Sequence, residues 1–204
     1  MIVPRWEWRT FGRSFGAADV RLAAVPPTRL DDSEEVYILS SRVEGSIKVR
    51  GGQLDVKRLE EVNDDGLQQW RPVANAEFPI AATDVAALLA ALDVNVPPLN
   101  RESYALDQLI DEVVAPHDDL LSVPVRKHRV HHMLDGCMTE LTDVRTASRT
   151  TRTIAVEDED PALVRSTVEA LELSSRPNIS VPHGLIQLLG LDWWPTELRR
   201  SSTS

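Results

Sequence analysis

Hydrophobic and polar residues alternate with a period of two along much of the chain. This alternation is typical of strands that have one buried and one polar face. It predicts eight strands, over residues 5–11, 36–39, 46–50, 54–59, 67–73, 123–133, 137–144 and 149–156. Gly51-Gly52 and Asp135-Gly136 are turn sequences, and each joins two of these strands as a hairpin. The pattern therefore predicts a largely antiparallel sheet.

Three longer segments carry their apolar residues at helical spacing and predict helices over residues 84–92, 102–114 and 160–171. A short helix is expected over residues 184–189. The helices do not alternate regularly with strands, as they would in a parallel sheet. The fold class is therefore α+β, with an antiparallel sheet that is closed or strongly curled. We expect one domain over residues 1–195 and a frayed tail over residues 196–204.

Composition narrows the functional classes. The 204 residues include 22 Lys and Arg against 32 Asp and Glu, which gives a net charge of −10 and argues against general nucleic-acid binding. The single cysteine, Cys137, excludes an internal disulfide framework. Residues 1–11 lack the basic segment, apolar stretch and cleavage site that are typical of a signal peptide, and no apolar run reaches about 20 residues. We expect a cytoplasmic protein that does not bind a membrane. The sequence leaves open whether the protein forms a homodimer.

Basic residues recur at alternate positions of four predicted strands. The residues concerned are Lys48, Arg50, Lys57, Arg71, Lys127 and Arg129. Acidic residues concentrate in predicted loops and helices, as in Asp31-Asp32 and Glu34-Glu35. If the sheet closes into a barrel, these basic faces line its lumen, where a polyanion such as a phosphate ester would relieve their repulsion. The alternative is that the basic faces are exposed to solvent, as is usual for antiparallel sheets.

Three carboxylates lie on predicted strands that are far apart in the sequence, namely Glu7, Glu140 and Glu157. Mg²⁺ and Mn²⁺ prefer carboxylate oxygens, and substrate phosphates complete their coordination shell. The carboxylates could converge at one mouth of a barrel and hold such an ion. They could equally form ion pairs with neighbouring arginines.

The order of the charged motifs carries a resemblance to a known family. The motifs are Arg5-Trp6-Glu7-Trp8-Arg9, Lys48-Val49-Arg50, Leu54-Asp55-Val56-Lys57, Lys127-His128-Arg129, Glu140-Leu141-Thr142-Asp143 and Ala155-Val156-Glu157. In this order they resemble the CYTH superfamily, the triphosphate tunnel metalloenzymes. The resemblance covers most of residues 3–190.

The resemblance implies an eight-stranded antiparallel closed β-barrel, or tunnel, with helices packed outside. It implies that basic side chains hold a triphosphate, with Arg9 among them, and that Glu7, Glu140 and Glu157 bind Mg²⁺ or Mn²⁺. The sequence departs from the family at Arg5 and Ala155, which stand where the family has glutamates, and at Arg9, which replaces a lysine. Fewer carboxylates weaken metal binding.

Three functional hypotheses follow. The first is a metal-dependent phosphohydrolase that acts on inorganic tripolyphosphate or on a nucleoside or thiamine triphosphate inside a basic tunnel. The alternative is a catalytically degenerate module that binds anions or proteins on the same scaffold. The third is a plain α+β domain whose basic strand faces are solvated.

Overall fold

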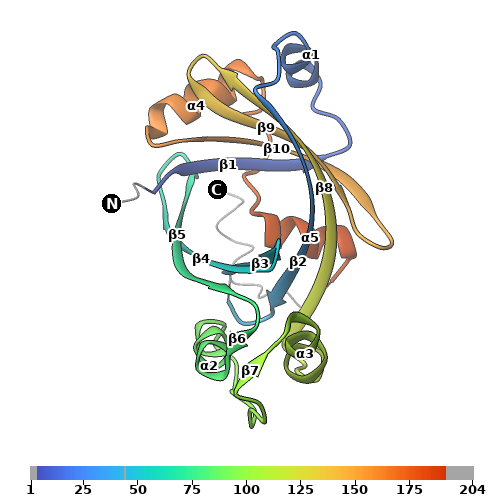
Figure 1. The fold of residues 1–204 in the computed structure, drawn as a ribbon. Helices are drawn as coiled ribbons and strands as arrows, with labels where there is room; N and C mark the ends of the chain where they lie inside the picture. Colours follow the sequence, from blue (N-terminus) through green and yellow to red (C-terminus); the bar gives the residue numbers. More distant parts are fainter. Residues whose placement is uncertain (1–3, 44, 192–204) are drawn as a thin grey trace.

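The structure is a computed structural model that describes residues 4–43 and 45–191. Eight long strands form a closed antiparallel barrel, which confirms the predicted fold class (Figure 1). They are hydrogen-bonded in the order β1 (Trp6–Gly12), β10 (Thr150–Asp158), β9 (Cys137–Arg145), β8 (Leu120–Leu134), β2 (Arg29–Ser40), β3 (Gly45–Arg50), β4 (Gln53–Val62) and β5 (Gln68–Glu77). The predicted tail at residues 196–204 lies outside the described residues.

Helices lie on the outside of the barrel in two groups (Figure 1). One group consists of α1 (Ala17–Ala23) and α4 (Pro161–Ala170), which lie near β1, β9 and β10. The other consists of α2 (Ala82–Ala91), α3 (Leu106–Leu109) and a π-helical turn, η1 (Ile110–Val114), joined to a small sheet of β6 (Ile80–Ala81) and β7 (Ser103–Tyr104). No helix in the described part of the chain is long and apolar enough to cross a membrane.

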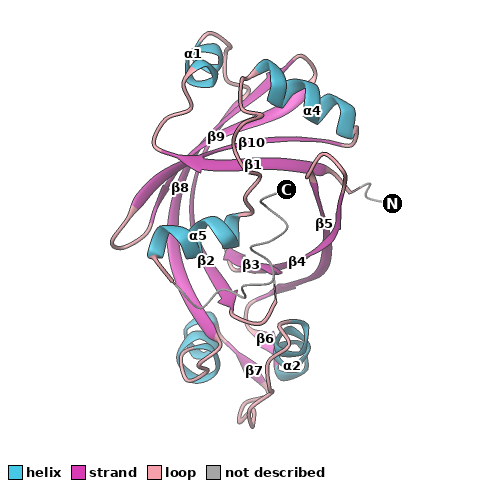
Figure 2. Cartoon of the chain, turned by 180° about the vertical axis from the view of Figure 1, so that it is seen from behind, coloured by secondary structure: helices cyan, strands magenta, loops and turns pink. Residues whose placement is uncertain are grey.

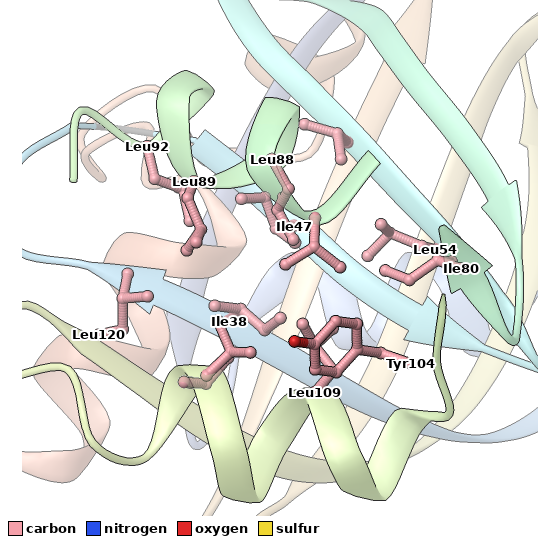
Figure 3. Close-up of a cluster of buried hydrophobic side chains, with 14 of the residues drawn as sticks. Ile38, Ile47, Leu54, Ile80, Leu88, Leu89, Leu92, Tyr104, Leu109 and Leu120 are labelled. Carbon is pink, nitrogen blue, oxygen red and sulfur yellow. The ribbon is translucent and has the colours of Figure 1, made fainter. Parts of the chain in front are cut away.

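The two largest hydrophobic clusters in the described part of the chain lie outside the barrel, between its strands and these helices. On β2, β3 and β4 the buried apolar residues Ile38, Ile47 and Leu54 pack against Leu89 of α2 and Leu109 of α3 (Figure 3). Burying each such side chain stabilises the fold by about 1.5–3 kcal/mol. A second cluster joins Trp8, Ile154 and Val156 to α4 and α1. Because successive side chains of a strand point to opposite faces, covering the apolar face outside turns the polar face toward the lumen.

The fifth helix, α5 (Val181–Leu189), belongs to neither group. It lies across the opening of the barrel (Figure 2). Leu185 and Ile186 belong to a buried cluster with Tyr37 of β2 and Val125 of β8. Gly184 lies so close to the Phe11 ring that an added Cβ would be 2.3 Å from its Cε2 atom. Only glycine permits this approach, which seats α5 against β1.

The segment before α5 binds the edge of β1 that β5 leaves unpaired, since β5 pairs with β1 only at Trp6 and Glu7. The Asn178 side chain accepts a hydrogen bond from the Arg9 backbone N–H (2.8 Å) and donates to the carbonyls of Glu7 (3.1 Å) and Gly66 (2.9 Å). The Ile179 N–H donates to the Arg9 carbonyl (2.6 Å). These bonds satisfy backbone groups that the barrel ladder does not reach.

Several predicted boundaries are wrong, and two of these differences have a clear physical reason. β2 begins at Arg29, not at residue 36, so Asp31-Asp32 and Glu34-Glu35 lie in a strand and not in a loop. Their cross-strand partners on β8 explain this, because Asp32 lies opposite His128 and Glu34 opposite Arg126, and opposite charges stabilise such pairs. The predicted helix over residues 102–114 begins later, at Leu106, because Ser103 and Tyr104 pair with β6.

Candidate anion-binding site

The lumen of the barrel contains a cavity of about 170 Å³ whose walls are mostly charged. Nine of the ten predicted site residues line it: Glu7, Arg9, Lys48, Arg50, Lys57, Lys127, Arg129, Glu140 and Glu157. Arg29 and His131 also line the cavity, and Ser180 to Pro182 at the start of α5 form part of its wall. The alternation of charges along separate strands thus brings these residues together.

Arg71 is the predicted site residue that the barrel does not bring to the cavity. It is exposed and its guanidinium forms an ion pair with Glu60 at 3.2 Å. Its neighbour Trp70 is the β5 residue that lines the cavity. The side chains of β5 alternate so that Trp70 takes the lumen face, and Arg71 therefore takes the outer face.

Glu35 of β2 is a functional candidate that the sequence prediction missed. Its side chain is fully buried, and its carboxylate pairs with Lys127 (Nζ–Oε2 3.3 Å) and with the Arg129 guanidinium. The hydroxyls of Tyr37 (2.9 Å) and Ser33 (3.1 Å) donate hydrogen bonds to it, and Lys127 donates to Tyr37 (2.6 Å). Burial alone would raise the pKa of Glu35, but Lys127 and Arg129 hold it well below its usual range.

The pKa of Lys127 is shifted in turn by the same group of charges. Burial lowers its pKa, Glu35 partly offsets the effect, and the nearby Arg129 and Arg9 lower it further. Lys127 and Glu35 therefore depend on each other, because either charge alone would be poorly solvated in this place.

Arg9 of β1 lies between two of the predicted metal ligands. Its Nε donates to Glu7 Oε1 at 2.7 Å, and its Nη1 donates to Glu140 Oε1 at 3.3 Å. Burial disfavours its charge, but Glu7 and Glu140 more than offset this and raise its pKa. Glu140 also accepts a hydrogen bond from Thr142 at 2.7 Å. Against the effect of burial, Arg9, Thr142 and Arg129 lower the pKa of Glu140 to about 2.

Other charged groups that line the cavity lack such close partners. Within residues 4–43 and 45–191, Lys48, Lys57 and Glu157 have no ion pair. Burial lowers the pKa of Lys48, and the like charges of Arg50 and Lys57 lower it further, although Glu35 opposes them. Burial, Glu7 and Glu140 raise the pKa of Glu157. Lys48, Lys57 and Glu157 are therefore charged groups of the cavity that no neighbouring side chain neutralises by an ion pair within the described residues.

The chain was compared with known families, sequences and structures, and only solved structures gave a match. No protein-family model and no curated protein sequence matches the chain. Among solved structures, it is similar to an adenylyl cyclase candidate from Hippeastrum with a dominant triphosphatase activity, at 14% identity and a TM-score of 0.52, over 93% of this chain and 98% of that one. The chain has the triphosphate tunnel fold.

Two further solved structures match with lower TM-scores. A conserved hypothetical protein from Pyrococcus furiosus has 14% identity and a TM-score of 0.47, over 83% of this chain and 91% of that one. An adenylate cyclase candidate from Bacillus halodurans has 10% identity and a TM-score of 0.46, over 91% of this chain and 98% of that one.

As they are arranged in this structure, the carboxylates of the cavity do not form a binding site for a divalent cation. Arg9 is bonded to both Glu7 and Glu140 and supplies the positive charge that an ion would supply. Among the residues described, no three His, Cys, Asp or Glu side chains form a group that could hold a metal. A divalent ion would first have to displace the guanidinium, whose charge repels it. The predicted ligand set of Glu7, Glu140 and Glu157 stays a prediction.

The lowered pKa of Glu140 predicts acid sensitivity. A carboxylate whose folded pKa lies below its unfolded value stabilises the fold above the unfolded pKa, and this contribution is lost as the pH falls. We expect the part due to Glu140 to disappear between pH about 4.5 and about 2. Urea unfolding of Glu140→Gln at several pH values should therefore show a smaller loss of stability across this window than the natural chain shows.

Asp143→Asn is the matched control, because Asp143 lies on the same strand but is exposed. It should leave the pH dependence close to that of the natural chain. If Glu140→Gln loses as much stability as the natural chain over the same pH window, the Arg9–Glu140 pair does not contribute in the way described.

Proposed function

We propose that the tunnel binds a triphosphate, either inorganic tripolyphosphate or the triphosphate group of a nucleotide or of thiamine triphosphate. The observation that carries this proposal is the charge of the cavity. Seven Lys and Arg side chains line it, against the three lining carboxylates of Glu7, Glu140 and Glu157. Even when the buried Glu35 is included, cations exceed carboxylates. The chain as a whole has the opposite charge, −10, so the basic lumen is a local feature.

The geometry favours an anion with several linked charges over a single small anion. The cations come from β1, β2, β3, β4 and β8 and approach the cavity from different sides. Arg side chains suit phosphate oxygens as bidentate donors, and Lys supplies a compact charge. Lys48 and Lys57 lie on adjacent strands. Burial lowers the pKa of Lys48, and the like charges of Arg50 and Lys57 lower it further, so a bound anion would stabilise its charge.

Hydrolysis of the bound triphosphate is a second candidate function, and Glu157 is the residue that favours it. Its carboxylate lines the cavity and forms no ion pair within the described residues. As a general base, it would accept a proton from a water molecule whose oxygen attacks the terminal phosphorus. The bond from that phosphorus to the bridging oxygen would break. Tripolyphosphate would give phosphate and pyrophosphate, and a nucleotide or thiamine triphosphate would give phosphate and the corresponding diphosphate.

Binding is tested by removing the two lysines without close carboxylate partners. Lys48→Ala and Lys57→Ala should each weaken tripolyphosphate binding about tenfold, because each removes one charged contact with phosphate oxygens. Isothermal titration calorimetry in the presence of EDTA measures this. Arg71→Ala is the matched control, since it removes a cation that lies outside the cavity. Equal effects of all three variants would show that general charge, and not the cavity, attracts the anion.

Hydrolysis is tested by phosphate release from tripolyphosphate and ATP, with Mg²⁺, Mn²⁺ and EDTA in parallel. If the tunnel is a hydrolase with Glu157 as its base, Glu157→Gln should reduce the rate about a hundredfold or more while tripolyphosphate still binds. The absence of release from well-folded protein that binds the anion would leave a binding function only. Release that Glu157→Gln does not slow would exclude Glu157 as the base.

A further inference from the structure

Glu35 is surrounded by the kind of groups that bind a phosphoryl group. Two cations, Lys127 and Arg129, and two hydroxyls, those of Tyr37 and Ser33, point at its carboxylate. Arg50 approaches it more distantly, at 3.9 Å. Charge-assisted donors of this type bind phosphate and carboxylate oxygens alike. The carboxylate therefore takes up donors that an incoming phosphate would otherwise use.

The cations of the cavity consequently fall into two sets. Lys127 and Arg129 are buried, with side chains about 5% and 6% exposed, and both pair with Glu35. Arg129 also pairs at longer distance with Asp31 (3.4 Å) and Glu140 (3.6 Å). Lys48 and Lys57 are less buried and have no such partner among the described residues. A polyphosphate chain held by the second set would meet the negative charge of Glu35 as it extended toward the first. Like charges brought together in a partly desolvated site repel strongly.

We propose that Glu35 is a specificity-determining residue of the tunnel, a tethered carboxylate that occupies the position of one phosphoryl group beside Lys127 and Arg129 and so sets the chain length of the anion that binds. This inference rests on the proposed binding function. Its consequence is that the third phosphoryl group of tripolyphosphate contributes less to affinity than the basic lumen would otherwise give. Removing the charge of Glu35 should restore that contribution.

The experiment compares the dissociation constants of pyrophosphate and tripolyphosphate in Glu35→Gln, measured by calorimetry in EDTA. The preference for tripolyphosphate over pyrophosphate should increase about tenfold, because the third phosphoryl group then reaches Lys127 and Arg129. Glu34→Gln is the matched control. Glu34 is the preceding residue of β2, is largely exposed and pairs with Arg126 at 2.9 Å, so its replacement should leave the preference unchanged.

Thermal unfolding distinguishes the proposed role of Glu35 from a purely structural one. Removing one member of a buried ion pair destabilises a protein strongly, so Glu35→Gln should unfold at a lower temperature. Under the proposal, tripolyphosphate replaces the missing charge and raises the unfolding temperature of the variant more than that of the natural chain. A folded variant with an unchanged preference, and no larger stabilisation by tripolyphosphate, would overturn the proposal.

If Glu35→Gln does not fold, the double variant Glu35→Gln/Lys127→Met takes its place, because it removes one charge of each sign. Its preference for tripolyphosphate should still rise, since Arg129 loses its pairing with Glu35 and keeps only the longer ion pairs with Asp31 (3.4 Å) and Glu140 (3.6 Å), and an unchanged preference would overturn the proposal. The proposed function fails separately if the natural chain binds neither anion. In that case, tripolyphosphate binding by the variant alone would support the role of Glu35, and binding by neither protein would overturn both.

Discussion

The ion pairs between Glu35 and the two cations Lys127 and Arg129 stabilise the buried charges inside the barrel. Charges buried inside a protein are stable only when partners and hydrogen bonds replace the lost water. Glu35 supplies that replacement from β2, and its partners come from β8, about 90 residues later in the chain. Arg9 plays the corresponding part for Glu7 and Glu140, and the contact between Arg129 Nε and Glu140 Oε2 at 3.6 Å joins the two groups.

This charged interior is possible because the two largest hydrophobic clusters lie outside the barrel. Residues such as Ile47 and Leu54 face α2 and α3 outside the barrel, while Lys48 and Lys57 on the same strands face the lumen. Folding thus draws its main driving force from the helix–sheet contacts, and the charged side chains of the lumen are not needed for the hydrophobic core. The start of α5 forms part of the cavity wall, so the same helix that packs on the barrel also limits the space inside it.

Much of this arrangement could be predicted from the sequence, because strand alternation and motif order are local properties. The strand faces of Lys48 and Arg50 followed directly from period-two alternation. Glu35 could not be found this way, because it follows a run of acidic residues that is typical of a loop, and only its distant partners on β8 make it part of a strand. Arg71 was wrongly assigned to the lumen, since the sequence does not show which face of β5 turns inward.

Under the proposed binding function, the chain's own side chains supply the positive charge for a triphosphate, with Arg9 in place of a metal ion. Calorimetric titration with tripolyphosphate at constant ionic strength, in EDTA and in excess Mg²⁺, distinguishes this arrangement from a metal-dependent site. We predict binding in EDTA that is at least as tight as in Mg²⁺, because Mg²⁺ neutralises the free anion that the cations would bind. Binding that requires Mg²⁺ would contradict the account and would assign Glu7, Glu140 and Glu157 to a metal ion.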